Sequence, residues 1–253
     1  MKYNGLIFDF DYTLGDSTEG IFASVNYALE RLGHPQADRE AVRKTIGLHL
    51  EETYRVLVLK ADQPETEEAT REAEPGEFIK TQGNTMKPPQ AENADNMEVQ
   101  AEKFAGYFRE KADQVMVANT SFFPGALEVL QKWKGQGIRL AIVTTKYHYR
   151  IDAILEKYHA AGLFDVIVGG EDVTLPKPNP EGILKVQDFW QMEKEQILYV
   201  GDSLVDARTA HAAGMDFAGV TTGTTPKEAL ERYPNVGVFD SLAEISEEME
   251  RNL

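Results

Sequence analysis

Two aspartates, Asp9 and Asp11, stand one residue apart at the end of an apolar segment that begins at Leu6. The alternation of side chains along a β-strand predicts that both point to the same side. Two carboxylates about 4 Å apart repel each other by roughly 4 kcal/mol at an effective dielectric near 20. The pair therefore needs a cation or a proton, and a divalent metal ion is the obvious candidate. A lone Asp-x-Asp is also common at strand ends and helix N-caps, so the rest of the chain has to decide.

Three further segments carry polar groups at the ends of strand-like runs or on the loops between them. These groups are hydroxyls, an ammonium group and carboxylates, in chain order Thr144 and Thr145, Lys177, and Asp202 with Asp206. Taken alone, Asp202 could be a helix N-cap and Lys177 a solvated loop charge. If all the segments meet at one end of a parallel sheet, however, they form a chemical site, and coincidence becomes a poor explanation.

The elements that would position these groups alternate between strands and helices from residue 124 onwards. Such alternation predicts an α/β fold, a doubly wound Rossmann-like parallel sheet with helices on both faces. Apolar periodicity places the strands and helices of this part at 138–144, 149–158, 164–169, 180–190, 197–201, 205–213 and 217–221.

Between the first strand and this alternation, the periodicity is helical, with helices expected at 17–32, 39–46, 50–60 and about 97–117. We therefore expect a catalytic core of residues 1–15 and 121–253 and an inserted α-helical domain of residues 16–120. Residues 62–96 are rich in polar residues and proline, which predicts an irregular or partly mobile loop rather than a functional lid.

Composition limits the classes of function. The chain has 253 residues, 42 of them acidic and 26 basic, and a formal net charge of −16. This charge repels nucleic acids and anionic membranes, so we expect neither as a partner. The absence of cysteine excludes disulfides and cysteine-ligated metals. No signal peptide is predicted and no stretch approaches the roughly 18 apolar residues of a membrane span, so we expect a cytoplasmic protein.

With its motifs in this order, the sequence resembles the haloacid dehalogenase-like hydrolase superfamily, in particular its C1-capped phosphatases of the phosphoglycolate phosphatase and β-phosphoglucomutase type. The resemblance covers nearly the whole chain and includes Phe123-Pro-Gly125 and Ala212-Ala-Gly-Met215, which flank the second and fourth motifs. It implies that the helical insertion is a cap domain. One departure is Tyr12, where the family often carries glycine; it leaves the carboxylates in place but affects the room around them.

The resemblance implies roles for the four aspartates. Asp9 would be the nucleophile and a metal ligand. Asp11 would bind the metal through its backbone carbonyl, so that its free side chain could protonate the leaving alcohol and then activate water. Asp202 would bind Mg²⁺, and Asp206 would orient metal-bound water or Lys177.

The same resemblance implies the groups that bind the substrate. Thr144 would bind a phosphoryl oxygen by its hydroxyl, with Thr145 as a further contact. Lys177 would neutralise the nucleophile and the transferring phosphoryl group. A loop of the insertion would carry His49 towards the site, as a loop does in family members; the alternative is that His49 is simply exposed to solvent. Lys146, by contrast, is expected on a helix face near the cleft.

Charge gives an independent reason for a metal ion. A phosphomonoester brings about two negative charges, and the four aspartates supply up to four more. Lys177 alone cannot offset six. Oxygen-rich, cysteine-free surroundings suit Mg²⁺. A carboxylate could then attack the phosphorus in line and give an aspartyl phosphate, which water hydrolyses.

We therefore predict a Mg²⁺-dependent phosphatase that acts on a small phosphorylated metabolite as a monomer or homodimer. A phosphosugar mutase or a pyrophosphatase of the same superfamily is an alternative. A non-catalytic phospho-acceptor or binding module is another, since receiver domains also combine an acidic pocket, a threonine and a lysine on a doubly wound sheet. The cap favours the enzyme, because a receiver has no need to exclude bulk water.

Overall fold

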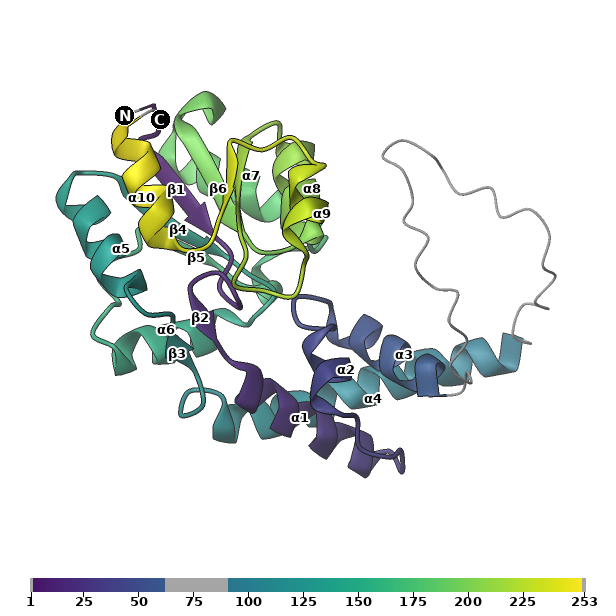
Figure 1. Ribbon diagram of the computed structural model, residues 1–253. Coiled ribbons are helices and arrows are strands. Elements are labelled where there is room, and N and C mark those ends of the chain that lie inside the picture. The colour runs from purple at the N-terminus through teal and green to yellow at the C-terminus, as the bar shows by residue number, and fades with distance from the viewer. Residues whose placement is uncertain (1, 62–90, 252–253) are drawn as a thin grey trace, which may run out of the picture.

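The computed structural model describes residues 2–61 and 91–251. A sheet with helices packed on it forms one part of the molecule, and the helices α1 to α4 gather below it (Figure 1). Strand β1 points from the first part towards the second (Figure 1). The expected arrangement, an α/β core with an inserted helical layer, is confirmed.

Six parallel strands form the main sheet, in the order β5-β4-β1-β6-β7-β8. The strand order reverses at β1, which lies between β4 and β6. In open parallel sheets, ligands bind beyond the carboxyl ends of the strands at such a reversal. The strands are β1 (Gly5–Phe8), β4 (Arg139–Val143), β5 (Val166–Val168), β6 (Ile197–Gly201), β7 (Asp216–Val220) and β8 (Gly237–Phe239).

Alternating side chains give the sheet two buried faces. Leu6 and Phe8 contribute to one apolar cluster and Ile7 to the other. The first cluster is covered by helices α5 (Ala126–Gly135), α6 (His148–Lys157) and α10 (Leu242–Arg251). The second cluster is covered by α7 (Glu181–Trp190), α8 (Leu204–Ala213) and α9 (Lys227–Glu231). Two short 3₁₀ helices lie at Gly170–Asp172 and Lys194–Gln196.

The inserted layer enters and leaves through a two-stranded antiparallel ribbon. Strand β2 (Gly15–Asp16) pairs with β3 (Ser121–Phe122). Between them lie α1 (Thr18–Arg31), α2 (Arg39–Arg43), α3 (Leu50–Ala61) and α4 (Ala91–Val115). These helices bury an apolar cluster of their own, which includes Val25, Tyr54 and Phe104. The layer therefore has a separate core and does not depend on the sheet for all of its burial.

Some element boundaries differ from those expected. Helix α4 begins at Ala91, so the prediction of irregular structure over 62–96 is wrong for its last six residues, while 62–90 lies outside the described residues. The first turns of this helix were not predicted, because their residues are mostly polar and show no apolar periodicity. Strand β8 and helices α9 and α10 follow the last element that we predicted. Within the described ranges, no helix is long and apolar enough to cross a membrane.

Candidate active site

The predicted site residues meet at the carboxyl end of the sheet. Asp9 directly follows β1, Thr144 follows β4 and Asp202 follows β6, and these three strands are neighbours. Lys177 comes from the loop between β5 and α7, and Asp206 from the first turn of α8. The structure thus brings together residues that are up to 197 positions apart in the chain.

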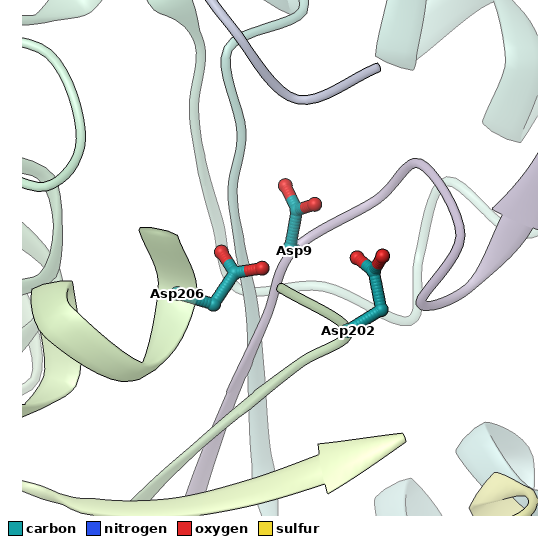
Figure 2. Close-up of side chains that lie close together, drawn as sticks. All are labelled: Asp9, Asp202 and Asp206. Atoms are coloured by element: carbon teal, nitrogen blue, oxygen red, sulfur yellow. The ribbon is translucent and has the colours of Figure 1, made fainter. Parts of the chain in front are cut away.

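Three buried carboxylates form the centre of the site. Asp9, Asp202 and Asp206 each place one carboxylate oxygen within 4.8 Å of the others (Figure 2). Burial raises the pKa of Asp9 to about 6, and the charge of Asp206 adds to this effect while Lys177 opposes it. Burial and the neighbouring carboxylates also raise the pKa of Asp202 well above its usual range. The cluster therefore has more negative charge than its protein surroundings offset.

Lys177 is the cation inside this cluster. Its Nζ lies 2.9 Å from Asp9 Oδ1 and 2.7 Å from Asp206 Oδ1, and it donates a hydrogen bond of 3.3 Å to the hydroxyl of Tyr199. Burial alone would lower the pKa of Lys177, but the carboxylates of Asp206 and Asp9 outweigh burial and raise it well above its usual value. All three ammonium protons thus have an acceptor nearby.

Asp206 is held rigidly. Its Oδ2 accepts hydrogen bonds from the hydroxyl and the backbone N–H of Ser203, at 2.5 and 3.2 Å, and its Oδ1 accepts one from Tyr199 at 3.0 Å. Ser203 and Asp206 form the capping box that begins α8. A Cβ at Gly201 would lie 2.4 Å from Asp206 Cβ, so only glycine lets the strand pass this close.

Asp11 belongs to a different ion pair. Strand β1 ends at Phe8, before either aspartate, so strand alternation does not determine where the two side chains point. Asp11 instead lies in a turn, where the backbone N–H groups of Leu14 and Gly15 donate to the carbonyl of Phe10. Its Oδ2 is 3.1 Å from Lys146 Nζ, and both side chains are at least nine-tenths buried.

Lys146 is therefore a site residue that sequence reasoning missed. We expected it on a helix face, but α6 begins only at His148. The residue lies instead in the loop that follows β4, and its backbone N–H donates 3.2 Å to Thr144 Oγ1. The signal that could have identified it is its position directly after the two threonines at the end of a buried strand.

The two threonines face the space next to this cluster. Thr144 is buried, and its hydroxyl proton remains available, because the one hydrogen bond described for this hydroxyl is accepted from Lys146. Thr144, Thr145, Lys177 and His49 line one small pocket. Thr145 also lines a larger cavity between the sheet and the helical layer.

That larger cavity has a volume of about 180 Å³. Asp11, Thr145 and Lys146 line it from the core, and His49 and Arg109 are among the residues that line it from the helical layer. His49 Nε2 is buried and has no hydrogen-bond partner among the described residues. Burial lowers the pKa of His49, so its imidazole is neutral at pH 7. The structure thus places His49 beside the site, as the resemblance implied.

Tyr12 connects the Asp11 turn with the helical layer. Its φ of 61° lies in the left-handed region that favours glycine, the residue often found here in the family. The hydroxyl of Tyr12 lies 2.9 Å from Thr18 Oγ1 in α1, and it accepts a hydrogen bond of 3.2 Å from Arg43 Nε in α2. The ring is buried, so the side chain fills space between the two parts of the molecule.

The site suits a hard divalent cation. Asp9, Asp202 and Asp206 carry three negative charges and Lys177 one positive charge, which leaves two negative charges when all are ionised. The three candidate ligands offer only oxygen, the donor that Mg²⁺ prefers, and none offers sulfur or imidazole. One divalent ion would balance the charge of this buried cluster.

Comparison with known proteins gives consistent matches over the chain. The profile of a family described as haloacid dehalogenase-like hydrolase matches residues 6–220. Phosphoglycolate phosphatase of Salmonella choleraesuis (strain SC-B67) is 33% identical over 244 residues, covering 95% of this chain and 90% of that protein. The protein of the same name from Escherichia coli (strain K12) is 31% identical over 241 residues, with the same coverage. A crystal structure of a haloacid dehalogenase-like hydrolase from Bacteroides fragilis is 37% identical, covers 96% of this chain and 100% of that chain, and has a TM-score of 0.79.

Proposed function

Because the chain belongs to the haloacid dehalogenase-like hydrolase family and is a phosphoric monoester hydrolase of the phosphoglycolate phosphatase type, we propose that it hydrolyses a small phosphorylated metabolite with Mg²⁺ through an aspartyl phosphate on Asp9. The observation that supports this most directly is the buried cluster of Asp9, Asp202 and Asp206 around Lys177, with two uncompensated negative charges. Such a cluster is costly unless it binds a cation.

Asp9 is the proposed nucleophile. Its buried carboxylate lies at the end of β1, and Lys177 2.9 Å away holds it in place and offsets its charge. An oxygen of Asp9 attacks the phosphorus, a P–O bond to Asp9 forms, and the P–O bond to the alcohol breaks. Lys177 and the hydroxyl of Thr144 stabilise the charge on the transferring phosphoryl group. In a second step water attacks the same phosphorus and releases phosphate and free Asp9.

Asp11 is the proposed acid and base. It donates a proton to the oxygen of the leaving alcohol and later takes a proton from the attacking water, so it ends the cycle as it began. Its carboxylate lines the cavity between core and cap, where the alcohol would lie. The pairing with Lys146 at 3.1 Å fixes its position.

Mg²⁺ would be held by Asp9, Asp202 and the backbone carbonyl of Asp11, with Asp206 orienting its ligands. Bound there, it would neutralise the carboxylates and polarise a phosphoryl oxygen. This chain's own contribution is the rigid position of Asp206, set by Ser203 and by Tyr199.

Residues 16–120 would act as the cap and residues 1–15 and 121–253 as the catalytic core. The cap would exclude water from the cavity that it shares with the core, which strengthens the electrostatic interactions inside. A phosphosugar mutase or a pyrophosphatase would use the same core chemistry. The relatives named as phosphatases favour simple hydrolysis over either, and the hydrolase family opposes a non-catalytic phospho-acceptor. Cytoplasmic location and a monomeric or homodimeric state stay predictions.

Hydrolysis of an aryl phosphate tests the proposal. We expect turnover that requires Mg²⁺, stops in excess chelator and is suppressed by Ca²⁺, whose larger and looser coordination misplaces the nucleophile. Asp9→Asn should abolish turnover and the acid-stable phosphoenzyme trapped by rapid quench with labelled substrate. Asp165→Asn, which changes a partly buried ion pair with Lys134 outside the candidate site, is the matched control and should keep both. Full activity in chelator, or labelling that survives Asp9→Asn, would refute the proposed mechanism.

A further inference from the structure

The loop that follows β7 contacts the turn that carries Asp11. Thr222 in this loop donates a hydrogen bond from its Oγ1 to the backbone carbonyl of Tyr12, which lies 210 positions earlier in the chain. Among the described residues, no other group donates a hydrogen bond to this carbonyl. Loop and turn are neighbours because β7 pairs with β6 and β6 pairs with β1, so the loops after these parallel strands leave the same edge of the sheet.

Two peptide groups meet at Tyr12, and hydrogen bonds fix both. The N–H of Tyr12 donates to the carbonyl of Gly15 at 2.8 Å and fixes the peptide group that joins Tyr12 to Asp11. This peptide is trans, so the carbonyl of Asp11, the proposed metal ligand, points away from Gly15. The bond from Thr222 fixes the next peptide group, which joins Tyr12 to Thr13.

The backbone of Tyr12 needs such support. Its φ of 61° is uncommon for a residue other than glycine, and residues keep such a conformation only where the surrounding contacts hold it. Without the hydroxyl of Thr222, the backbone of Tyr12 can relax. Relaxation changes the angle between the two peptide groups and with it the direction of the Asp11 carbonyl.

The same loop also packs on Asp202. A Cβ at Gly223 would overlap Oδ2 of Asp202, so the backbone of the loop passes directly beside this carboxylate. The other oxygen of Asp202, Oδ1, accepts a hydrogen bond of 3.3 Å from Thr13 Oγ1. The loop is anchored to β8, because the N–H of Thr221 donates to the carbonyl of Phe239 at 2.9 Å. An anchored loop therefore touches both the Asp11 turn and Asp202.

We propose that Thr222 is a positioning residue for metal binding. Its hydroxyl holds the carbonyl of Tyr12, so that the Asp11 carbonyl and the carboxylate of Asp202 are directed at the same ion. The inference rests on the proposed function, which places Mg²⁺ between these ligands, and it adds a residue that lies in none of the sequence motifs. Thr222 acts through the turn and not on the ion itself.

The test measures binding of the metal alone, without substrate. Mn²⁺ takes the same oxygen ligands as Mg²⁺, and the EPR signal of free Mn²⁺ gives the bound fraction. Competition with Mg²⁺ then gives the Kd of Mg²⁺. Titration to saturation separates the number of sites from the Kd, so a partly unfolded variant shows fewer sites rather than weaker ones. Thermal unfolding in chelator reports the stability of each variant separately.

Thr222→Val keeps the shape of the side chain and removes the hydroxyl. It should raise the Kd of both ions roughly 3- to 10-fold, the range expected for one lost hydrogen bond. Thr222→Ser keeps the hydroxyl, so its Kd should lie close to that of wild type. In kinetics, Thr222→Val should need more Mg²⁺ for half-maximal activity, while kcat at saturating Mg²⁺ stays close to that of wild type.

Thr221→Val is the matched control. It removes a threonine hydroxyl from the same loop, one that donates to Asp240 Oδ1 at 2.9 Å and does not contact the Asp11 turn. The Kd of both ions should therefore stay that of wild type, even if the variant loses some stability.

Three results would overturn the proposal: an unchanged Kd in Thr222→Val, a Kd in Thr222→Ser as high as in Thr222→Val, or an equal rise in Thr221→Val. Each of these leaves the proposed function intact. Failure of the proposed function looks different, because the wild-type enzyme would then bind no Mn²⁺ or would keep its turnover in excess chelator. The role of Thr222 would fall with it.

Discussion

The substitution Tyr199→Phe removes one hydroxyl group, which contacts both Lys177 and Asp206 beside the proposed nucleophile. This hydroxyl donates to Asp206 Oδ1 at 3.0 Å and accepts from Lys177 at 3.3 Å. Burial, and then the charge of Asp206, raises the pKa of Tyr199 well above its usual value, so the hydroxyl stays a neutral donor. The ring remains in Phe, and no large cavity forms. The substitution therefore removes one hydrogen bond to a carboxylate and one acceptor of the lysine.

The magnitude follows from these two contacts. A hydrogen bond to a charged group contributes about 1.5–3 kcal/mol. Asp206 keeps Ser203 and Lys177 as partners, so we expect a loss near the lower end, about 2 kcal/mol of unfolding free energy. For a chain of this size that corresponds to a fall in Tm of about 4–8 °C. If about 1.4 kcal/mol is also lost from the transition state, kcat falls about tenfold, while KM stays close to that of wild type.

The chain supplies a matched control at the opposite end of the sheet. Tyr3 donates to Asp216 Oδ2 at 2.7 Å and accepts from Lys2 at 3.2 Å, which is the same arrangement of tyrosine, aspartate and lysine. Tyr3→Phe should also destabilise the fold, by about 1 kcal/mol, because Asp216 is partly exposed. Its kcat should not change. Thermal unfolding and Mg²⁺-saturated kinetics of both variants give the comparison.

Two outcomes would refute this reasoning. If Tyr199→Phe loses stability but keeps its full kcat, the hydroxyl does not position Lys177 and Asp206 for the reaction. If Tyr3→Phe lowers kcat to the same extent, the fall in kcat of Tyr199→Phe reflects a general loss of stability of the sheet rather than a local effect at the site.

Four further predictions concern the surroundings of the site. His49→Ala should change the order of kcat/KM values across a panel of phosphorylated metabolites, each measured relative to an aryl phosphate; an unchanged order would show that His49 takes no part in selection. Glu181 accepts hydrogen bonds from the backbone N–H groups of Leu175 and Thr174 and from Lys185, and these lower its pKa to about 2. Its contribution to stability is therefore complete above about pH 4.5 and is lost as the pH falls through 2, so urea unfolding should separate wild type from Glu181→Gln at pH 7 but not near pH 2. Gly201→Ala should displace Asp206 and lower both Tm and kcat, because the new Cβ would lie 2.4 Å from Asp206 Cβ; normal kinetics would contradict this. Tyr12→Phe removes the hydrogen bonds to α1 and α2, so amide exchange should rise in α2 and stay constant in α7, and equal exchange in α2 would refute the link.

The sequence was sufficient to predict five of the six strands of the sheet and the carboxylates at its edge. Each central strand is a short apolar run that ends at a polar residue, and parallel strands bring their carboxyl ends to one edge. Asp9, Thr144 and Asp202 could therefore be assigned to one place before any coordinates. Their mutual distances could not, because side-chain geometry depends on the loops that follow the strands.

Other site residues depend on packing that periodicity does not encode. Tyr199 lies in a buried strand, where apolar periodicity predicts a core residue. Nothing in the sequence indicates that its hydroxyl contacts Lys177 and Asp206. Lys146 lies in a loop whose length decides whether its ammonium group reaches Asp11 or solvent. Arg109 lines the cavity only because α4 packs over the core. This packing depends on contacts between segments more than 30 residues apart, such as the ion pair of Arg150 with Asp113.

The two aspartates of the first motif are separated by one residue in the sequence, yet they pair with different lysines. Asp9 shares Lys177 with Asp206, whereas Asp11 has Lys146 to itself. Each lysine stabilises its own carboxylate, so the repulsion expected of two such close acids is divided between two ion pairs. One carboxylate can then act at the phosphorus while the other exchanges a proton with the alcohol or with water. Under the proposed function, this pairing with two lysines lets residues two positions apart perform different steps of one reaction.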